Sequence, residues 1–208
     1  MTQKVKLCIG IAGLALLIGA ASIAYNALAA RVEPAARLAL PGQAAQAAQA
    51  EEWAGDGAAP QTAQAAQRQR APDFAMTDWD GNTLRLSDII AGGRPVALNF
   101  WASWCPSCRR EKPAFEAVYR DMGDQVKFVM LGLADGMRET VETGQRYITD
   151  GGFTLPVYFD TLREGAAAYG IRFIPATVFI DASGYIAAEA QGALDEQSLR
   201  RAIGLLLQ

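Results

Sequence analysis

The sequence predicts an α/β domain, a mixed central sheet flanked by helices, preceded by one transmembrane helix. Three observations predict this class. Apolar runs of strand length alternate with helical patterns over the last two thirds of the chain, the series ends with a hairpin and an amphipathic helix, and residues 7–30 contain no charged side chain. Alternation of strands and helices places helices on both faces of a sheet, because each connection packs back onto the strands.

The charge-free run near the N-terminus is long enough to cross a membrane. As a helix, residues 7–30 would reach about 36 Å, against ~30 Å for the hydrocarbon core. Lys4 and Lys6 precede the run, which places the N-terminus in the cytoplasm and the rest outside. We expect residues 1–30 to anchor an extracytoplasmic domain in the cytoplasmic membrane. A small-x-small motif ending at Ala29 would instead permit cleavage and secretion.

Residues 31–70 are expected to be a flexible linker. They are rich in alanine and glutamine and have few larger aliphatic side chains, so they cannot bury much of a core. The folded domain is expected over residues 71–208, where 13 basic and 18 acidic side chains give a net charge of −5. An acidic domain without a basic stripe argues against nucleic-acid binding. The absence of histidine removes the usual general base and a common metal ligand, and we expect no cofactor.

Each expected element of the domain follows from a local pattern. Alternating apolar residues around an Asp/Gly/Asn turn predict a hairpin, and continuous apolar runs predict buried strands. Helical spacing that ends at glycine, or begins at a capping Ser or Asp, predicts helices. In order, these are a hairpin over 74–86 with its turn at 78–82, a helical turn capped by Ser87 or Asp88, a strand at 96–101, a helix from Cys108 to Met122 ended by Gly123, a strand at 126–133, a helix at 139–150 ended by Gly151, a strand at 156–159, a helix at 164–169 ended by Gly170, strands at 177–180 and 185–191 around a turn at 182–184, and a helix capped by Asp195 and running to Leu207.

The chemistry is expected at Cys105-Pro106-Ser107-Cys108, where strand 96–101 leads into a helix. Two cysteines at this spacing and in this context suit reversible thiol–disulfide exchange. Unpaired N–H groups and the dipole at a helix start favour a thiolate, and such sites lower a thiol pKa from ~8.5 to roughly 3.5–7.5. We therefore predict an exposed, easily ionised Cys105 as nucleophile and a more buried Cys108 as resolving thiol. Pro106 restricts the turn and suits a first helical position.

The cysteine pair has two other interpretations. A zinc site needs four ligands, and this chain has three cysteines and no histidine. The third cysteine, Cys8, lies far away within the N-terminal apolar run. A purely structural disulfide is the other possibility, but a four-residue loop is too short to brace a fold well.

The order of the expected elements and the motifs they carry together resemble the thioredoxin superfamily. More narrowly, they resemble its TlpA/ResA/DsbE-like extracytoplasmic thiol–disulfide oxidoreductases. The resemblance covers about residues 72–207. It is carried by four segments, residues 72–74 with 80–81, residues 99–108 with Glu111 and Pro113, residues 169–171 with 174–177, and residues 179–181 with 184. It implies the thioredoxin fold with an N-terminal β-hairpin extension.

The resemblance also implies residue roles around the disulfide. Pro175 matches a cis proline that faces the cysteine pair, and the backbone of Ile174 would pair with an extended segment of the partner. Trp104 would cover the disulfide and offer the partner a flat surface. Together with Pro106, these residues form the expected substrate-binding surface.

A proton-relaying carboxylate is the last role that the resemblance implies. Glu111 lies one helical turn after Cys108, so a partly buried carboxylate with a raised pKa could exchange a proton with that thiol. Its alternative is an exposed glutamate paired with an arginine. Asn99 occupies the place where cytosolic thioredoxins carry a buried aspartate, which makes Glu111 more important.

These inferences lead to a membrane-tethered thiol–disulfide oxidoreductase. The resemblance implies that it reduces extracytoplasmic protein disulfides, such as those of apocytochromes c, with electrons from a separate membrane protein. Alternatives are a disulfide-forming oxidase and a redox-sensing module whose cysteine pair switches binding. A cysteine peroxidase would need a Thr/Ser and Pro arrangement before the cysteine, where this chain has Trp104.

Overall fold

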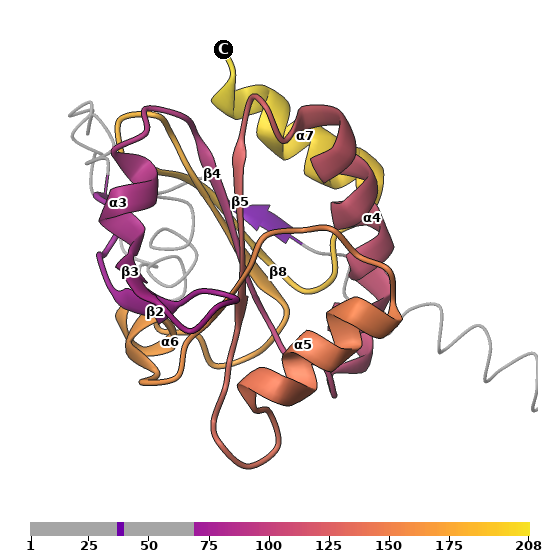
Figure 1. The fold of residues 1–208 in the computed structure, drawn as a ribbon. Coiled ribbons are helices and arrows are strands. Elements are labelled where there is room, and N and C mark those ends of the chain that lie inside the picture. The colour runs from indigo at the N-terminus through magenta and orange to yellow at the C-terminus, as the bar shows by residue number, and fades with distance from the viewer. Residues whose placement is uncertain (1–36, 40–68) are drawn as a thin grey trace, which may run out of the picture. The chain divides into compact units, whose positions relative to one another are not determined.

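The computed structural model describes residues 37–39 and 69–208. Strands of one sheet run through these residues, with helices on both faces (Figure 1). The strands are β1 Arg37–Ala39, β2 Ala75–Thr77, β3 Thr83–Arg85, β4 Val96–Trp101, β5 Lys127–Gly132, β6 Val157–Phe159, β7 Ala176–Ile180 and β8 Ile186–Gln191. The helices are α3 Leu86–Ile90, α4 Pro106–Met122, α5 Val141–Asp150, α6 Glu164–Ala168 and α7 Glu196–Leu206.

The sheet is mixed, as the sequence predicts, and its strand order is β1-β8-β7-β4-β5-β6-β2-β3. Strand β4 pairs in parallel with β5 and antiparallel with β7. Strand β6 continues the parallel side, whereas β8 continues the antiparallel side. Because β4 lies between these two sides and leads directly into α4, the end of β4 is where the cysteine motif enters the structure.

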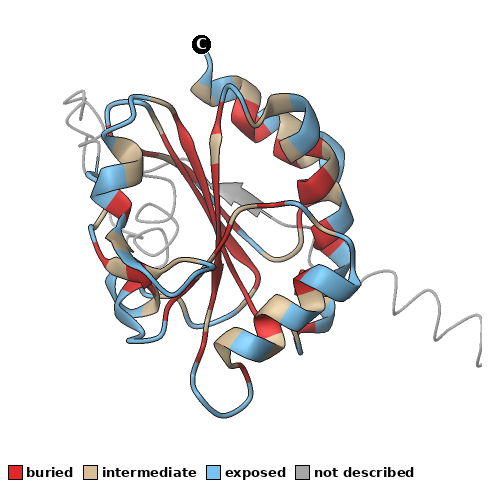
Figure 2. Cartoon of the chain, viewed as in Figure 1, coloured by how far each residue is buried: buried red, intermediate tan, exposed pale blue. Residues whose placement is uncertain are grey.

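The core forms two layers, one on each face of the sheet. Helices α4, α5 and α7 cover one face, and α3 and α6 lie over the other (Figure 1). All six residues of β4 are buried, and Figure 2 shows the helices buried along the sides that face the sheet. Alternation along β4 sends Trp101 toward the first layer and Leu98 and Phe100 toward the second.

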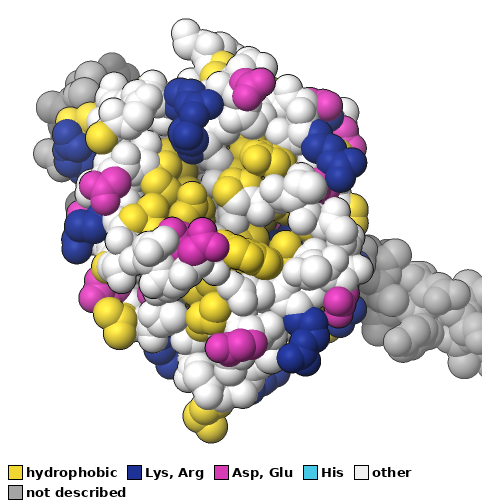
Figure 3. Space-filling view, viewed as in Figure 1, with side chains coloured by type: hydrophobic (Ala, Val, Ile, Leu, Met, Phe, Trp, Pro, Cys, Tyr) yellow, Lys and Arg dark blue, Asp and Glu magenta, His cyan; other side chains and the backbone are white. Residues whose placement is uncertain are grey.

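The end of the sheet remote from the cysteine motif carries a cavity between α3 and the C-terminal part of α4. Its lining includes the side chains of Ile89, Tyr119 and Phe128 and also Lys127. Figure 3 shows hydrophobic side chains gathered near the centre of the viewed face of the domain, with acidic and basic side chains interspersed around them. Lys127 begins β5, so this cavity lies at the opposite end of the parallel strands from the cysteine motif.

Most expected elements are found, with shifted ends. Segments of the expected hairpin lie at β2 and β3, which pair antiparallel with Ala75 opposite Arg85. Helix α4 begins at Pro106, two residues before the predicted start. The reason is local, because the Cys105 Sγ caps the helix by accepting the Cys108 N–H, and proline needs no N–H partner at a first helical position.

One strand was not predicted. Strand β1, residues 37–39, lies within the expected linker and pairs antiparallel with β8, with Arg37 opposite Gln191. The expected membrane segment, residues 1–30, and most of the linker lie outside the described residues. Within the part of the chain that is described, the helices are all too short or too polar to span a bilayer.

Candidate active site

The two cysteines of the motif form a disulfide at the start of α4. Cys105 is the N-cap residue, and its Cα lies 5.3 Å from that of Cys108 in the first turn. The Cys105 Sγ accepts a hydrogen bond from the Cys108 backbone N–H at 3.3 Å. This N–H belongs to the orphan donors of a helix start, which interact more strongly with a thiolate than with a thiol. The geometry can therefore stabilise a charged sulfur at position 105.

The expected exposure of Cys105 is wrong for this disulfide state. Cys105 is only 4% exposed, and Cys108 is 0% exposed. Trp101, Ala102 and the first turn of α4 share the same core cluster, so the capping position packs into the protein instead of projecting from it. The expected order of burial, with Cys108 deeper than Cys105, is confirmed.

A loop that precedes β7 lies against the disulfide. The Ile174–Pro175 peptide bond is cis, as the family resemblance implied. The Cys105 Sγ lies 3.7 Å from the Ile174 carbonyl oxygen. Cys105 and Ile174 are far apart in sequence but close in space, because β7 pairs with β4 and brings the loop before β7 to the end of β4.

Glu111 follows Cys108 by one helical turn on α4 and is buried, with only 2% of its surface exposed. Its carboxylate accepts hydrogen bonds from the Asn99 side-chain amide at 2.9 Å and from the Leu194 backbone N–H at 3.1 Å. Burial raises the pKa of Glu111 to about 7, and these two hydrogen bonds oppose the rise. The alternative of an exposed glutamate paired with an arginine is excluded. Glu111 also lines a cavity between α4 and the turn before α7.

Sequence reasoning missed Lys112, which is fully buried in the same helix. Its Nζ lies 4.0 Å from the centre of the Trp101 ring and has no hydrogen-bond partner. Burial lowers the pKa of Lys112 to about 7, although the carboxylates of Glu111 and Glu139 oppose the fall. The sequence spacing does indicate that Lys112 is buried. Lys112 stands four residues after Cys108 and three before Phe115, on the face that α4 buries.

Glu139, just before α5, was also missed. One of its oxygens accepts hydrogen bonds from the Ser103 backbone N–H at 2.9 Å and from the Ser103 hydroxyl at 2.7 Å. The other oxygen, Oε1, is buried without a hydrogen-bond partner. Burial raises the pKa of Glu139, and the bonds from Ser103 oppose the rise. Glu139 therefore ties the loop before α5 to the loop that carries Cys105.

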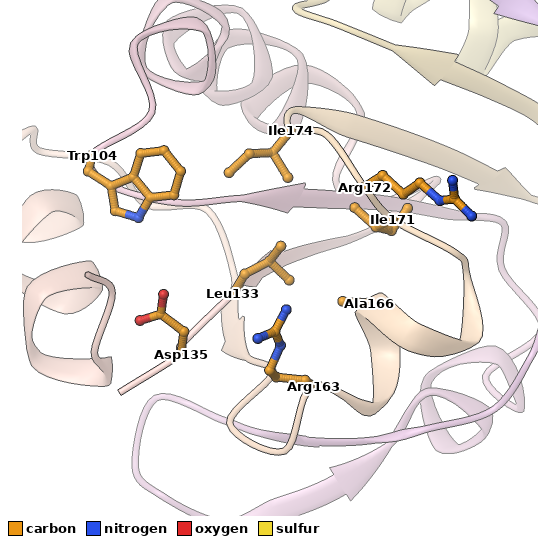
Figure 4. A pocket seen from close by; sticks show the side chains of 8 residues that line it. All are labelled: Trp104, Leu133, Asp135, Arg163, Ala166, Ile171, Arg172 and Ile174. Carbon is orange, nitrogen blue, oxygen red and sulfur yellow. The ribbon is translucent and has the colours of Figure 1, made fainter. Parts of the chain in front are cut away.

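Trp104 and Ile174 line a cavity of about 190 Å³ beside the disulfide. Figure 4 shows these two side chains along one edge and Asp135 and Arg163 along the opposite edge. Trp104 is 40% exposed, and the Arg138 guanidinium stacks 3.7 Å from its ring centre. Trp104 is thus partly exposed at the edge of this cavity, whereas its contact with a partner and its covering of the disulfide stay predictions. Pro106 is exposed at the start of α4.

Comparisons with known proteins identify the class of this site. Residues 68–189 match the model of the AhpC/TSA family. The chain is 30% identical over 138 residues to the thiol-disulfide oxidoreductase ResA of Halalkalibacterium halodurans, covering 66% of this chain and 76% of that protein.

Solved structures agree with the sequence relatives. A putative thiol:disulfide interchange protein DsbE from Chlorobium tepidum is 26% identical with a TM-score of 0.60, covering 68% of this chain and 97% of the other. StoA from Bacillus subtilis is 26% identical with a TM-score of 0.55, covering 64% and 96%. Together with the disulfide at the start of α4, these matches show that the chain belongs to the AhpC/TSA family and is a thioredoxin-like thiol–disulfide oxidoreductase of the ResA type.

Proposed function

We propose that this protein is anchored in the cytoplasmic membrane by residues 1–30 and reduces disulfides of extracytoplasmic proteins, such as apocytochromes c, through Cys105 and Cys108. The observation that carries the proposal is the position of Cys105. It caps α4, is bonded to Cys108, and lies 3.7 Å from the Ile174 carbonyl oxygen at the edge of a cavity. A sulfur at that place can form a mixed disulfide with a peptide lying along the cavity.

The reaction would proceed in two exchanges. The Cys105 thiolate attacks a partner disulfide, forming a mixed disulfide and releasing one partner thiolate. Cys108 then loses its proton and attacks Cys105, which releases the second partner thiolate and leaves the protein oxidised. A membrane dithiol protein would return two electrons by the reverse exchanges.

Glu111 is the group we propose as proton acceptor for Cys108. It lies one helical turn further along α4, and a carboxyl with a pKa near 7 can both take and return a proton at neutral pH. The cavity that reaches Glu111 from the α7 side would let the proton leave to solvent while a partner occupies the disulfide.

Partner binding would involve Trp104, Pro106, Ile174 and Pro175. The last two lie at the end of the loop before β7, where the Ile174 backbone can pair with an extended peptide. Trp104, exposed on the same edge of the cavity as Ile174, would pack against the same peptide.

Trapping of the mixed disulfide tests the nucleophile. Full-length Cys108→Ala, incubated with a disulfide-containing protein substrate such as insulin, should accumulate a covalent complex because the resolving thiol is absent. Full-length Cys105→Ala should not. Equal yields from both variants would overturn the assignment.

Direction is tested separately, by equilibrating the full-length protein with glutathione redox buffers. A protein that stays oxidised until the buffer is strongly reducing is a reductant of its partners, whereas one that is reduced readily is a disulfide-forming oxidase. Partner binding retained in a variant without insulin reduction would favour a redox-sensing module.

A further inference from the structure

Four buried polar side-chain atoms lack a hydrogen-bond partner among residues 69–208. They are Asn99 Oδ1, Trp101 Nε1, Lys112 Nζ and Glu139 Oε1. Unsatisfied buried polar atoms are uncommon and costly, and here they lie on β4, on α4 and in the loop before α5, which are the elements around the cysteine pair. The proposed function assigns roles to Glu111 and to the residues of the partner surface, but it assigns none to Lys112 or Glu139.

Lys112 is held on the buried face of α4 that also carries Cys108. Residues four apart on a helix lie on one face, about 5–6 Å apart at Cβ, so Lys112 stands one helical turn after Cys108 on the side that α4 buries. Its Nζ is over the Trp101 ring at 4.0 Å, and Trp101 ends the strand from which the cysteine loop departs. No protein acceptor binds its N–H groups, so its charge remains uncompensated by a direct hydrogen bond.

The charged and titratable groups that face Lys112 come from three places. Glu111 is its neighbour on α4, and Glu139 reaches it from the loop before α5. Tyr147 of α5 packs at a tilt against the Trp101 ring that Lys112 contacts, 5.7 Å between ring centres, and Arg109 lies over Tyr147 at 5.3 Å. Glu139 is therefore the buried opposite charge on the side of the cysteine loop, and that loop is fixed to it through Ser103.

We propose that Lys112 is an electrostatic positioning residue whose buried ammonium stabilises the thiolate formed when the Cys105–Cys108 disulfide is opened, and that Glu139 opposes this effect while it holds the cysteine loop. The inference rests on the proposed role of the cysteine pair. When a dithiol reduces the protein, the S–S bond breaks, two electrons pass to the two sulfurs, and the dithiol becomes a disulfide. One of its two protons stays on one cysteine and the other leaves to solvent, so one thiolate remains, and that thiolate is the species that Lys112 attracts.

The test measures the apparent thiol pKa of the reduced pair, from the pH dependence of Cys105 alkylation in the full-length protein, with mass spectrometry to confirm the modified residue. An opposite charge at short range shifts a pKa by about 1–3 units, and Glu139 offsets part of this. Lys112→Met should raise the thiol pKa by about one unit, which slows alkylation up to about tenfold at pH 6. It should also shift the equilibrium with glutathione toward the disulfide, because the reduced form is less stabilised.

Three further variants separate charge from structural damage. Lys112→Arg should restore the wild-type profile. Glu139→Gln keeps an acceptor for Ser103 but removes the opposing charge, so it should lower the thiol pKa. Lys127→Met removes a lysine at the remote end of the sheet and should leave the profile unchanged.

The inference is overturned if Lys112→Met matches Lys127→Met, or if Lys112→Met and Glu139→Gln shift the thiol pKa in the same direction. The Lys112→Met variant should fold, because Lys112 Nζ has no hydrogen-bond partner that the substitution would leave unsatisfied. If it does not fold, an unchanged profile in Glu139→Gln overturns the inference by itself. Failure of the proposed function is a different result, namely alkylation that does not map to Cys105 in the wild-type protein.

Discussion

At the scale of single residues, the active site is distinguished by ionisable groups placed where burial is costly. Glu111, Lys112 and Glu139 are all almost inaccessible to solvent, and each has a pKa displaced toward its neutral form. A buried carboxyl or ammonium is costly unless it is paired or neutral. Glu111 and Lys112 follow Cys108 on α4, and Glu139 binds the loop that carries Cys105, so all three belong to the elements that position the disulfide.

The raised pKa of Glu111 has a consequence for stability. Its pKa is about 7 in the folded chain, against an ordinary value of 4.5 for a glutamate side chain. Between these values the folded state binds more protons than the unfolded state, so this residue's contribution to stability is lost as the pH rises from about 4.5 to about 7. Glu111→Gln should abolish that part of the pH dependence, as measured by the urea midpoint of the full-length protein at several pH values.

Glu116 on the same helix provides a control of opposite sign. Burial alone would raise the pKa of Glu116, but hydrogen bonds from Thr154 and Arg120 lower it. Its contribution is present above the unfolded pKa and is lost as the pH falls, so Glu116→Gln should cost stability at pH 7 and little in acid. An unchanged slope between pH 4.5 and 7 in Glu111→Gln would contradict the account of Glu111.

At the scale of elements, the loop before α5 supports the cysteine loop through two contacts. Glu139 binds Ser103, and Arg138 stacks on Trp104. Asp135 holds the supporting loop by accepting the backbone N–H groups of residues 137, 138 and 139. The cysteine loop is thus positioned by an element about 35 residues away in sequence, which is why hydrophobic periodicity did not reveal the support.

Helix α5 must approach closely for this support to work, and Gly144 permits the approach. A Cβ at this position would lie 2.6 Å from a Phe159 ring carbon and 3.0 Å from Glu139 Oε1. Gly144→Ala should therefore destabilise the protein by about 1–3 kcal/mol, the usual cost of overpacking, despite alanine's better helix propensity. Urea denaturation measures the change.

Gly204 in α7 is the matched control, because a Cβ there would meet no atom within 4 Å. Gly204→Ala should stabilise the protein by up to about 1 kcal/mol. If both substitutions stabilise, Gly144 is not needed for close packing, and the account of α5 fails. Gly144→Ala should also slow the reduction of insulin disulfides, because the added methyl group displaces Glu139.

Whether an element could be predicted from the sequence depended on its length and its local pattern. Local patterns were sufficient for β4, α4, β5 and α7, because each is long, strongly apolar on one side and ended by a recognisable residue. The cysteine motif and Pro175 were identifiable from spacing and family resemblance. Strand β1 was not, since three residues paired with β8 leave no periodic signal.

Lys112 and Glu139 show a second limit. A charged residue in a helix is ordinarily read as solvent-exposed, and only the spacing from Cys108 to Phe115 indicated that Lys112 faces the core. The partner of Ser103 could not be found from sequence, because Glu139 reaches it only through the parallel pairing of β4 with β5. Tertiary placement of ionisable groups depends on several elements at once.

At the scale of the whole domain, charge is unevenly distributed. Residues 71–208 carry a net charge of −5. The cavity beside the disulfide nevertheless has arginines at its rim, with Arg163 and Arg172 lining it and Arg138 on Trp104. Asp135 is the acidic residue that lines this cavity, and it already accepts three backbone N–H groups. A basic rim on an acidic domain favours partners whose cysteines are flanked by acidic residues.

This charge pattern predicts a salt-dependent substrate preference. Two peptides with the same disulfide, one flanked by Asp and Glu and the other by Lys and Arg, should be reduced at different rates at low salt, the acidic one faster. Arg172→Glu should lower kcat/KM for the acidic peptide about three- to tenfold at low ionic strength, because a rim charge acts mainly on the encounter rate. In 0.5 M salt the difference should shrink, since screening shortens the range of the interaction.

The matched control is Arg201→Glu, which changes the net charge equally but alters α7, away from the residues that line the cavity. If net charge alone mattered, both variants would slow the acidic peptide to the same degree, and the local interpretation would fail. If the rim acts locally, Arg201→Glu should stay near wild type while Arg172→Glu approaches equal rates for the two peptides. Insulin reduction that persists in Arg172→Glu at high salt would show that the exchange chemistry itself is intact, so that the loss at low salt reports recognition.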